Sequence, residues 1–473
     1  MRQVFPQQLQ LGQSDIAQIE FNARSRDDIP QILRGLQHIY VTPALRDPVF
    51  AILEGLVPDQ VSAERGRPGM DLWKALVLAT LRVNLNWDYD RLLEMANQHK
   101  TIRQMLGHGL RDDGDDYKLQ TIKDNVDLLD EASLDQISQI VVNAGHSLLK
   151  KNETLLTARC DSFVVESNVH YPTDTNLLWD AMRCALRTVN QCCQARKVKG
   201  WRQWQYTTKQ VKKAFRKTQT LKHSTSKKPE RRAQRQQAIQ AAYEAYLNVC
   251  GQHLDRMETT LQDWGVTDII IGTAEADLQG FIQYGRKQMD LIRRRVLEGE
   301  KIPHADKVFS LFEPYTEWLS KGKAGVPVEL GLNVCVMESG SGFILHHKVM
   351  QHCTDSDIAV EMVREAKARF PGLSVCSFDK GFHSPDNQKT LAGLLDQVVM
   401  PCKGKLSKVR RDVEHAADFR QVRRQHSAVE SGINALEVHG LDRCPDRGLD
   451  HFKRYVALAV VGRNLQKLGA ILQ

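Results

Sequence analysis

The sequence predicts an α/β protein in which a mixed β-sheet core is joined to a helical N-terminal region and interrupted by a large basic helical insertion. Strand-like runs of apolar and β-branched residues occur in two distant blocks, near residues 155–165 and 326–400. Helical periodicity dominates the first 150 residues and the stretch between the two blocks. The densest run of basic residues, 196–235, also lies in that stretch.

The length and composition narrow the class of protein. A chain of 473 residues, 42% of them hydrophobic, predicts about two to four structural units with real cores. No run of about 18 apolar residues predicts a membrane span, and the segment from Met1 to Pro6 lacks the pattern of a secretory signal. The ten cysteines lack zinc-site spacing and are expected to be buried, reduced thiols. We therefore expect a cytoplasmic protein.

The N-terminal region is expected to be helical. Residues 1–60 form a mixed segment with a helix at 31–40, and residues 61–150 carry helical patterns at 71–85, 88–98, 119–129 and 133–150. A helix-turn-helix DNA-binding domain and an ordinary helical bundle explain the pattern of 61–150 equally well.

The expected insertion, residues 181–310, is strongly basic. Residues 196–235 hold fifteen Lys or Arg and a single acid, Glu230, although the whole chain carries a net charge of only +8. Such a patch attracts phosphate backbones and predicts a DNA-binding surface. The alternative is a charged helix that only faces solvent. Trp201 and Trp204 would stack on unpaired bases or simply pack. The expected DNA contacts are Lys199, Arg202, Lys209, Lys212, Lys213, Arg216 and Lys217.

The sheet core is expected from two segments, residues 151–180 and 311–473. The first supplies a strand at 155–165. The second supplies an alternating strand at 326–336, a hairpin turn at 339–342, a return strand at 343–350, a helix at 355–368, strands at 373–378 and 397–400, a helix at 389–395, and helical structure from residue 420. This order, with one hairpin, suits an RNase H-like mixed sheet.

Two acids belong to distant strands of this core. Asp161 lies inside an apolar strand, where an unpaired carboxylate is costly. Asp379 ends another strand and is followed by Lys380 and Gly381. A divalent metal pair is the usual counter-charge for such carboxylates. The alternative that these acids have only a structural or solvated role stays open, because a lone Asp at a strand end is usually solvated.

A third candidate acid lies on a helix expected over residues 420–438. Arg423, Glu430 and Glu437 are spaced by seven and share one stripe of this helix, on which His426 also lies. The stripe is typical either of a face aimed at metal or phosphate, or of an ordinary solvated face.

Three blocks of the chain resemble the catalytic motifs of bacterial insertion-sequence transposases with an Asp-Asp-Glu triad. They are Asp161 to Asp174, Ser377 to Ser384, and the run Arg423-x-x-His426-x3-Glu430-x6-Glu437 followed by Gly440 to Arg443. The group that they resemble most is the ISNCY transposases. The likeness also includes Arg65-Gly66-Arg67-Pro68 and Gly322-Lys323.

The resemblance implies an activity and a set of roles. Asp161, Asp379 and Glu430 would be the catalytic, metal-binding residues for two Mg²⁺ ions, with Mn²⁺ able to substitute. The enzyme would cleave DNA at transposon ends and transfer strands into target DNA, as a homodimer on paired ends in the bacterial nucleoid. Further DNA contacts would come from Arg65, Arg67, Lys380, His383, Lys403, Lys405, Arg423, His426 and Glu437.

Two positions depart from the motif. His426 stands where many relatives have Arg, and Glu437 where many have a basic residue, so the roles of both stay open. Two other functions are kept as alternatives: an RNase H-like nuclease without strand transfer, and a catalytically inactive DNA-binding regulator. The presence of all three acids argues against the inactive regulator.

Overall fold

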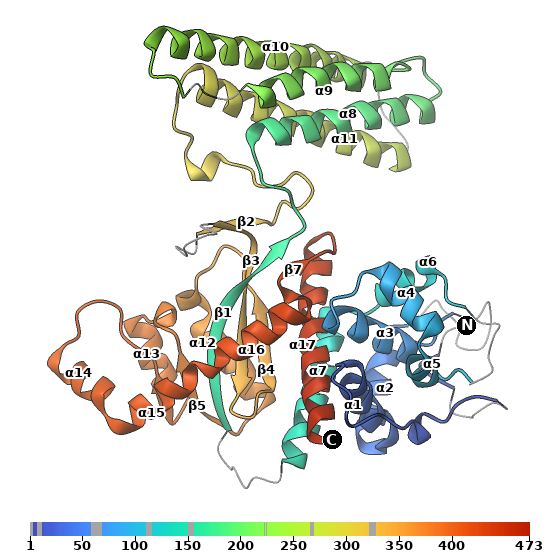
Figure 1. Cartoon of the computed structure of the whole chain (residues 1–473), viewed down its shortest axis with the longest axis vertical. Coiled ribbons are helices and arrows are strands. Elements are labelled where there is room, and N and C mark those ends of the chain that lie inside the picture. Colours follow the sequence, from blue (N-terminus) through green and yellow to red (C-terminus); the bar gives the residue numbers. More distant parts are fainter. Residues whose placement is uncertain are drawn as a thin grey trace. The chain divides into compact units, whose positions relative to one another are not determined.

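The computed structural model describes residues 3–6, 12–57, 69–109, 116–149, 156–221, 223, 225–264, 269–320 and 328–473. The chain divides into two compact units (Figure 1). The core unit comprises Met1–Asn168 and Leu319–Gln473, and the inserted unit comprises Val169–Trp318. The inserted unit thus begins before the expected residue 181 and ends after residue 310. Within the described part of the chain, every helix is too short or too polar to span a bilayer.

A mixed β-sheet forms the centre of the core unit. β1 (Leu156–Ser167) pairs antiparallel with β3 (Val328–Ser339) and parallel with β5 (Leu373–Phe378). The sheet continues through β4 (Ile344–Val349), which pairs with β3, and β6 (Gln397–Val399), which pairs with β5. The short strands β2 (Glu317–Ser320) and β7 (Arg443–Cys444), which the sequence did not predict, pair with β3 and β1.

Helices of the N-terminal region pack around the C-terminal helix α17 (Leu449–Ile471). The N-terminal helices are α1 (Ile29–Val41), α2 (Pro43–Glu54), α3 (Leu72–Asn84), α4 (Tyr89–Gln98), α5 (Lys100–Met105), α6 (Leu119–Val126) and α7 (Glu131–Leu148). α17 contacts α1, α3 and α7. At Gly35 the backbones of α1 and α17 approach so closely that a Cβ would strike the carbonyl of Leu465. α3 is buried along almost its whole length, so it presents no face to a DNA groove.

The remaining helices of the core unit follow the second strand block. They are α12 (Asp355–Arg369), α13 (Pro385–Ala392), α14 (Lys408–His415), α15 (Ala417–His426) and α16 (Ala428–Leu436). The single helix expected over 420–438 is wrong: Ser427 separates α15 from α16, and a π-helical turn begins at Glu437. The helix expected at 389–395 begins earlier, at Pro385, because the Ser384 hydroxyl caps it by accepting from the backbone N–H of Asn387.

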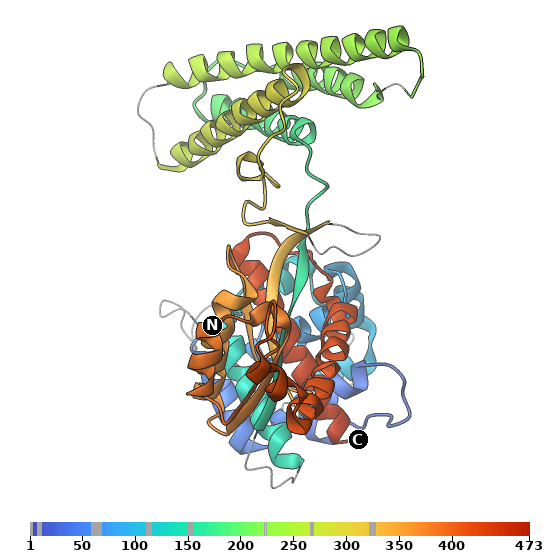
Figure 2. The ribbon, with the colours of Figure 1, turned by 90° about the vertical axis from the view of Figure 1, so that its left-hand side faces the viewer.

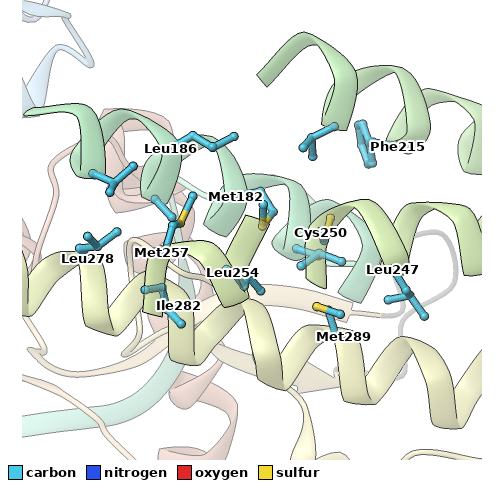
Figure 3. Close-up of a cluster of buried hydrophobic side chains, with 14 of the residues drawn as sticks. Met182, Leu186, Phe215, Leu247, Cys250, Leu254, Met257, Leu278, Ile282 and Met289 are labelled. Carbon is cyan, nitrogen blue, oxygen red and sulfur yellow. The ribbon is translucent and has the colours of Figure 1, made fainter. Parts of the chain in front are cut away.

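The inserted unit is a four-helix arrangement with its own apolar core. Its helices are α8 (Asp174–Ala195), α9 (Trp204–Thr220), α10 (Pro229–Gln262) and α11 (Ile269–Ile292) (Figure 2). Side chains from all four helices form one buried cluster that includes Leu186, Phe215, Leu254 and Ile282 (Figure 3). This unit therefore buries enough apolar surface to hold the basic segment on a packed scaffold.

Candidate active site

Two of the predicted acids lie side by side in the sheet. Asp161 is within β1, and Asp379 directly follows the last residue of β5. The two strands are parallel neighbours in which Cys160 pairs with Phe378, so the residues that come next, Asp161 and Asp379, are adjacent. Asp161 is half-buried and Asp379 is exposed. The parallel register, and not proximity in sequence, brings the two carboxylates together.

The third predicted acid, Glu430, is on the first turn of α16, which packs against β1. The preceding helix α15 packs against β5. A hydrogen bond of 3.0 Å between Ser377 Oγ and His426 Nδ1 ties the end of α15 to that strand. Glu430 is exposed. The fold therefore gathers Asp161, Asp379 and Glu430 from three elements into one region of the core unit.

A fourth acid, Asp355, joins this region although the sequence analysis did not single it out. Asp355 is the first residue of α12, and the hydroxyl of Ser162 donates a 2.7 Å hydrogen bond to its Oδ1. Its Oδ2 lies so close to Gly381 that a Cβ there would be only 2.6 Å away. In sequence, Asp355 looks like an ordinary first-turn acid, because Thr354 and Asp357 form a capping box around it.

The four carboxylates interact electrostatically. Burial is the largest cause that raises the pKa of Asp161, to about 6, and the charges of Asp379, Asp355 and Glu430 raise it further. The backbone N–H of Ser162, which donates to Asp161 Oδ1 at 2.8 Å, acts in the opposite direction. A carboxyl group with such a raised pKa marks a place where a cation would be stabilised.

His426 lies at the edge of the acid group in a neutral form. Burial lowers its pKa, and the charges of Arg159 and Arg423 lower it further, whereas Asp379 and Glu430 raise it. Its Nδ1 bonds to Ser377, and its buried Nε2 has no hydrogen-bond partner among the described residues. A neutral imidazole nitrogen that is buried next to acids can accept a proton or a hydrogen bond from a ligand.

The donor atoms of the acid group suit a hard divalent cation. Carboxylate oxygens are the ligands that Mg²⁺ prefers, and water and phosphate oxygens complete its shell. As the side chains lie, no three His, Cys, Asp or Glu residues of the described chain are close enough to hold one ion. The exposed side chains of Asp379 and Glu430 would therefore have to turn toward Asp161 to share an ion with it.

Two basic residues lie close to Asp379: Lys380 follows it in the chain, and Lys403 bonds to the segment just after it. Lys380 is exposed, and the Lys403 ammonium donates a 2.6 Å hydrogen bond to the carbonyl of Gly381. The backbone N–H of Lys403 also lies 3.4 Å from His383 Nδ1, and burial lowers the pKa of that histidine. Lys405 and Arg423 are exposed as well. These residues could hold the phosphates of a strand that crosses the acid group.

Other residues singled out in the sequence are placed elsewhere. Arg65 and Arg67 lie outside the described residues. Glu437 is half-buried at the start of the π-helical turn. The block from Asp161 to Asp174 continues into the inserted unit, where His170 Nε2 lies 3.4 Å from Asp180 and Arg295 lies 2.6 Å from Asp174. The Arg295–Asp174 ion pair ties the first residue of α8 to the π-helical turn after α11.

The basic segment presents its charges to solvent. Five of the seven predicted DNA contacts in this segment lie on α9 and two precede it, and all seven are exposed: Lys199, Arg202, Lys209, Lys212, Lys213, Arg216 and Lys217. Trp201, in contrast, is only 4% exposed, and its indole N–H donates to Thr260 Oγ1 at 3.2 Å. Trp201 is therefore packed within the inserted unit, which favours the packing alternative over stacking on bases. Tyr206, which is 61% exposed on α9, is the aromatic side chain that faces solvent among these charges.

Comparison of the chain with protein-family models, with curated proteins and with solved structures finds no match.

Proposed function

We propose that this protein is a DNA transposase of the Asp-Asp-Glu type, which cleaves DNA at the ends of a mobile element and joins the freed strand to target DNA. One observation carries the proposal: Asp161 is held half-buried with a raised pKa beside Asp379, Asp355 and Glu430. Carboxylates of like charge are costly to gather, and a pair of divalent cations is the usual reason to gather them. The resemblance of the three motifs supports the same activity.

The topology of the sheet supports an RNase H-like core. The strands follow the spatial order β4-β3-β1-β5-β6, with β1 antiparallel to β3 and parallel to β5. The hairpin β3–β4 precedes α12, and β5 follows it. This arrangement places the first acid on the central strand and the second at the end of its parallel neighbour.

The residues of the chain divide the work of the proposed reaction. Asp161, Asp379 and Glu430 would hold the cations, and Ser162 would keep Asp355 oriented beside them. Bound Mg²⁺ would supply an activated water and would stabilise the leaving oxygen. Lys380, Lys403 and Arg423 would hold the phosphodiester in line. The neutral His426 would accept a hydrogen bond from the attacking water or hydroxyl.

A nicking assay on supercoiled DNA that carries the element ends tests this function. We expect cleavage that depends on Mg²⁺ in the wild-type protein, and loss of cleavage by at least about a thousandfold in Asp161→Asn, with DNA binding retained. Asp412→Asn is the matched control, because Asp412 is an exposed residue of α14 outside the acid group. Cleavage by Asp161→Asn at the wild-type rate would refute the assignment.

The same assay separates strand transfer from simple hydrolysis. A labelled element end that is joined to a target plasmid supports a transposase. Cleaved ends without joined product would indicate an RNase H-like nuclease. Retained DNA binding without any cut in the wild-type protein would indicate an inactive regulator.

A further inference from the structure

The inserted unit contains a cavity of about 870 Å³ whose lining includes none of the four acids of the core unit. Its walls come from residues 171–176 at the start of α8, the end of α9, the middle of α10, the end of α11, the segment 295–309 that follows it, and Trp318. All of these segments belong to the inserted unit. A cavity of this size is within the usual range for sites that bind small organic ligands.

Gln288 of α11 lines this cavity and is only 1% exposed. Neither its Nε2 nor its Oε1 has a hydrogen-bond partner among the described residues. A buried amide without partners is destabilising, because it has lost its hydrogen bonds to water. Such an amide next to a cavity indicates a ligand that offers both a donor and an acceptor, which Gln288 would meet after a change of rotamer.

The lining of the cavity also includes aromatic rings. Tyr171 and Trp318 pack edge to face with 5.8 Å between their centroids, and Phe309 lies 5.6 Å from Trp318. Trp318 and Phe309 are half-buried, whereas Tyr171 is 62% exposed. Tyr171 therefore has a ring face available for stacking with a flat ligand at the entrance.

The charged residues of the cavity fall into two groups. Arg295 donates two hydrogen bonds to the Asp174 carboxylate, at 2.6 and 2.8 Å, so this pair satisfies itself. Glu300 is likewise engaged by Arg294. Lys301 and Lys307, which also line the cavity, are exposed. The entrance thus offers two ammonium groups to an anion such as a phosphate.

We propose that this cavity binds a nucleotide, with the base against Tyr171 and Trp318, the base edge on the Gln288 amide, and the phosphate near Lys301 and Lys307. An amide reads a base edge by pairing its carbonyl with a donor and its N–H with an acceptor. Aromatic rings stack on any base, and lysines hold phosphates. The nucleotide is either free in solution or an unpaired residue of a DNA strand. This inference rests on the proposed function insofar as DNA is the source of the strand.

Fluorescence of 2-aminopurine tests the proposal on the full chain in EDTA, so that binding is measured without cleavage. One probe is the free 2-aminopurine deoxynucleoside monophosphate, and the other is a single-stranded oligonucleotide with one central 2-aminopurine. We expect at least one probe to bind with quenched fluorescence. Quenching of the free nucleotide indicates a small-molecule site, and quenching of the oligonucleotide alone indicates a base taken from a strand.

Three variants decide whether this cavity is the site. Tyr171→Ala should weaken binding by about tenfold, because base stacking is lost. Gln288→Leu should weaken it by a similar factor while it raises the thermal unfolding midpoint, since the unpaired amide is gone. Phe312→Ala is the matched control, because Phe312 is an exposed aromatic residue of the same unit that does not line the cavity.

Binding by Gln288→Leu and Tyr171→Ala that equals the wild type would overturn the proposal. An equal loss in Phe312→Ala, or the absence of quenching with both probes, would overturn it as well. Nucleotide binding in a protein that cuts no DNA would leave the cavity site standing and would refute only the proposed nuclease chemistry. DNA cleavage without nucleotide binding would refute the cavity site and would leave the proposed nuclease chemistry standing.

Discussion

The hydroxyl of Ser162 donates a 2.7 Å hydrogen bond to Asp355, and this bond joins β1 to the first turn of α12 right beside Asp161. Ser162 directly follows Asp161 in β1. Its bond to Asp355 therefore holds this acid, which the sequence did not indicate, next to the predicted acid Asp161. Its position makes the fourth carboxylate part of the same electrostatic group.

Removal of this hydrogen bond should impair the reaction more than the fold. In Ser162→Ala, Asp355 loses the donor that orients it, so we expect cleavage to fall by about tenfold, the usual effect of one lost hydrogen bond to a charged group. Ser147→Ala removes an exposed hydroxyl of α7 and serves as control. Single-turnover cleavage rates measure the effect, and equal rates for Ser162→Ala and the wild type would deny Asp355 a role.

The raised pKa of Asp161 predicts a pH-dependent stability effect. Its pKa is about 6 in the folded chain against 3.8 as the ordinary value, so the folded state binds the proton more tightly and loses stability as the pH rises through this interval. Without metal, Asp161→Asn should increase the free energy of unfolding at pH 7.5 by about 1–3 kcal/mol.

Urea denaturation in EDTA at two pH values measures this difference. The advantage of Asp161→Asn should vanish near pH 4, where the wild-type carboxyl is already protonated in the folded state. Exposed Asp412→Asn should show no such pH dependence. If Asp161→Asn were less stable than the wild type at pH 7.5, the surroundings would stabilise the charged Asp161 carboxylate, which would contradict its raised pKa.

The exposed basic face of α9 predicts a strong dependence of DNA binding on salt. Each phosphate contact releases counterions, with a slope of about −0.9 per contact for duplex DNA. Replacement of Lys212, Lys213, Arg216 and Lys217 by Gln should therefore weaken binding and reduce the slope by up to about 3–4. Anisotropy titrations at several salt concentrations measure the slope.

Arg286→Gln is the control for that titration. Arg286 lies in the same unit, but its guanidinium is already engaged by Glu258 and Asp255. The Arg286→Gln variant should therefore show the same salt dependence of DNA binding as the wild type. If the fourfold variant keeps the wild-type slope, the basic face of α9 is only a solvated surface.

Burial predicts that Trp201 supports the inserted unit and does not contact DNA directly. Its ring packs beneath Arg256, whose guanidinium carbon lies 4.4 Å from the ring centroid. Trp201→Ala should destabilise the unit by about 3–5 kcal/mol, as expected for a large buried aromatic residue. Thermal unfolding measures the loss. An unchanged unfolding midpoint with weaker single-strand binding would favour stacking on bases instead.

Local patterns predicted much of the core. The apolar strand around Asp161 and the alternating strand before the hairpin form as expected, because their periodicity matches the two faces of a sheet. Asp379 was predictable as the residue that ends β5. The proximity of Asp161 and Asp379 was only an inference from resemblance, since the parallel register that makes them neighbours depends on long-range pairing.

Other features had no local signal. Asp355 is indistinguishable from a capping residue until Ser162 is seen to bond to it. The break at Ser427 occurs without Pro or Gly, and β7 is only two residues long. α17 is buried on nearly all sides, so its sequence pattern does not reveal that it packs with the N-terminal helices.

Binding of Mn²⁺, a paramagnetic substitute for Mg²⁺, tests the central claim most directly. Electron paramagnetic resonance of the full chain can count bound ions without any DNA reaction. We predict that the wild type and Asp412→Asn bind Mn²⁺, and that Asp161→Asn, Asp379→Asn and Glu430→Gln each lose at least one ion. Equal Mn²⁺ binding by all five proteins would contradict a shared metal site.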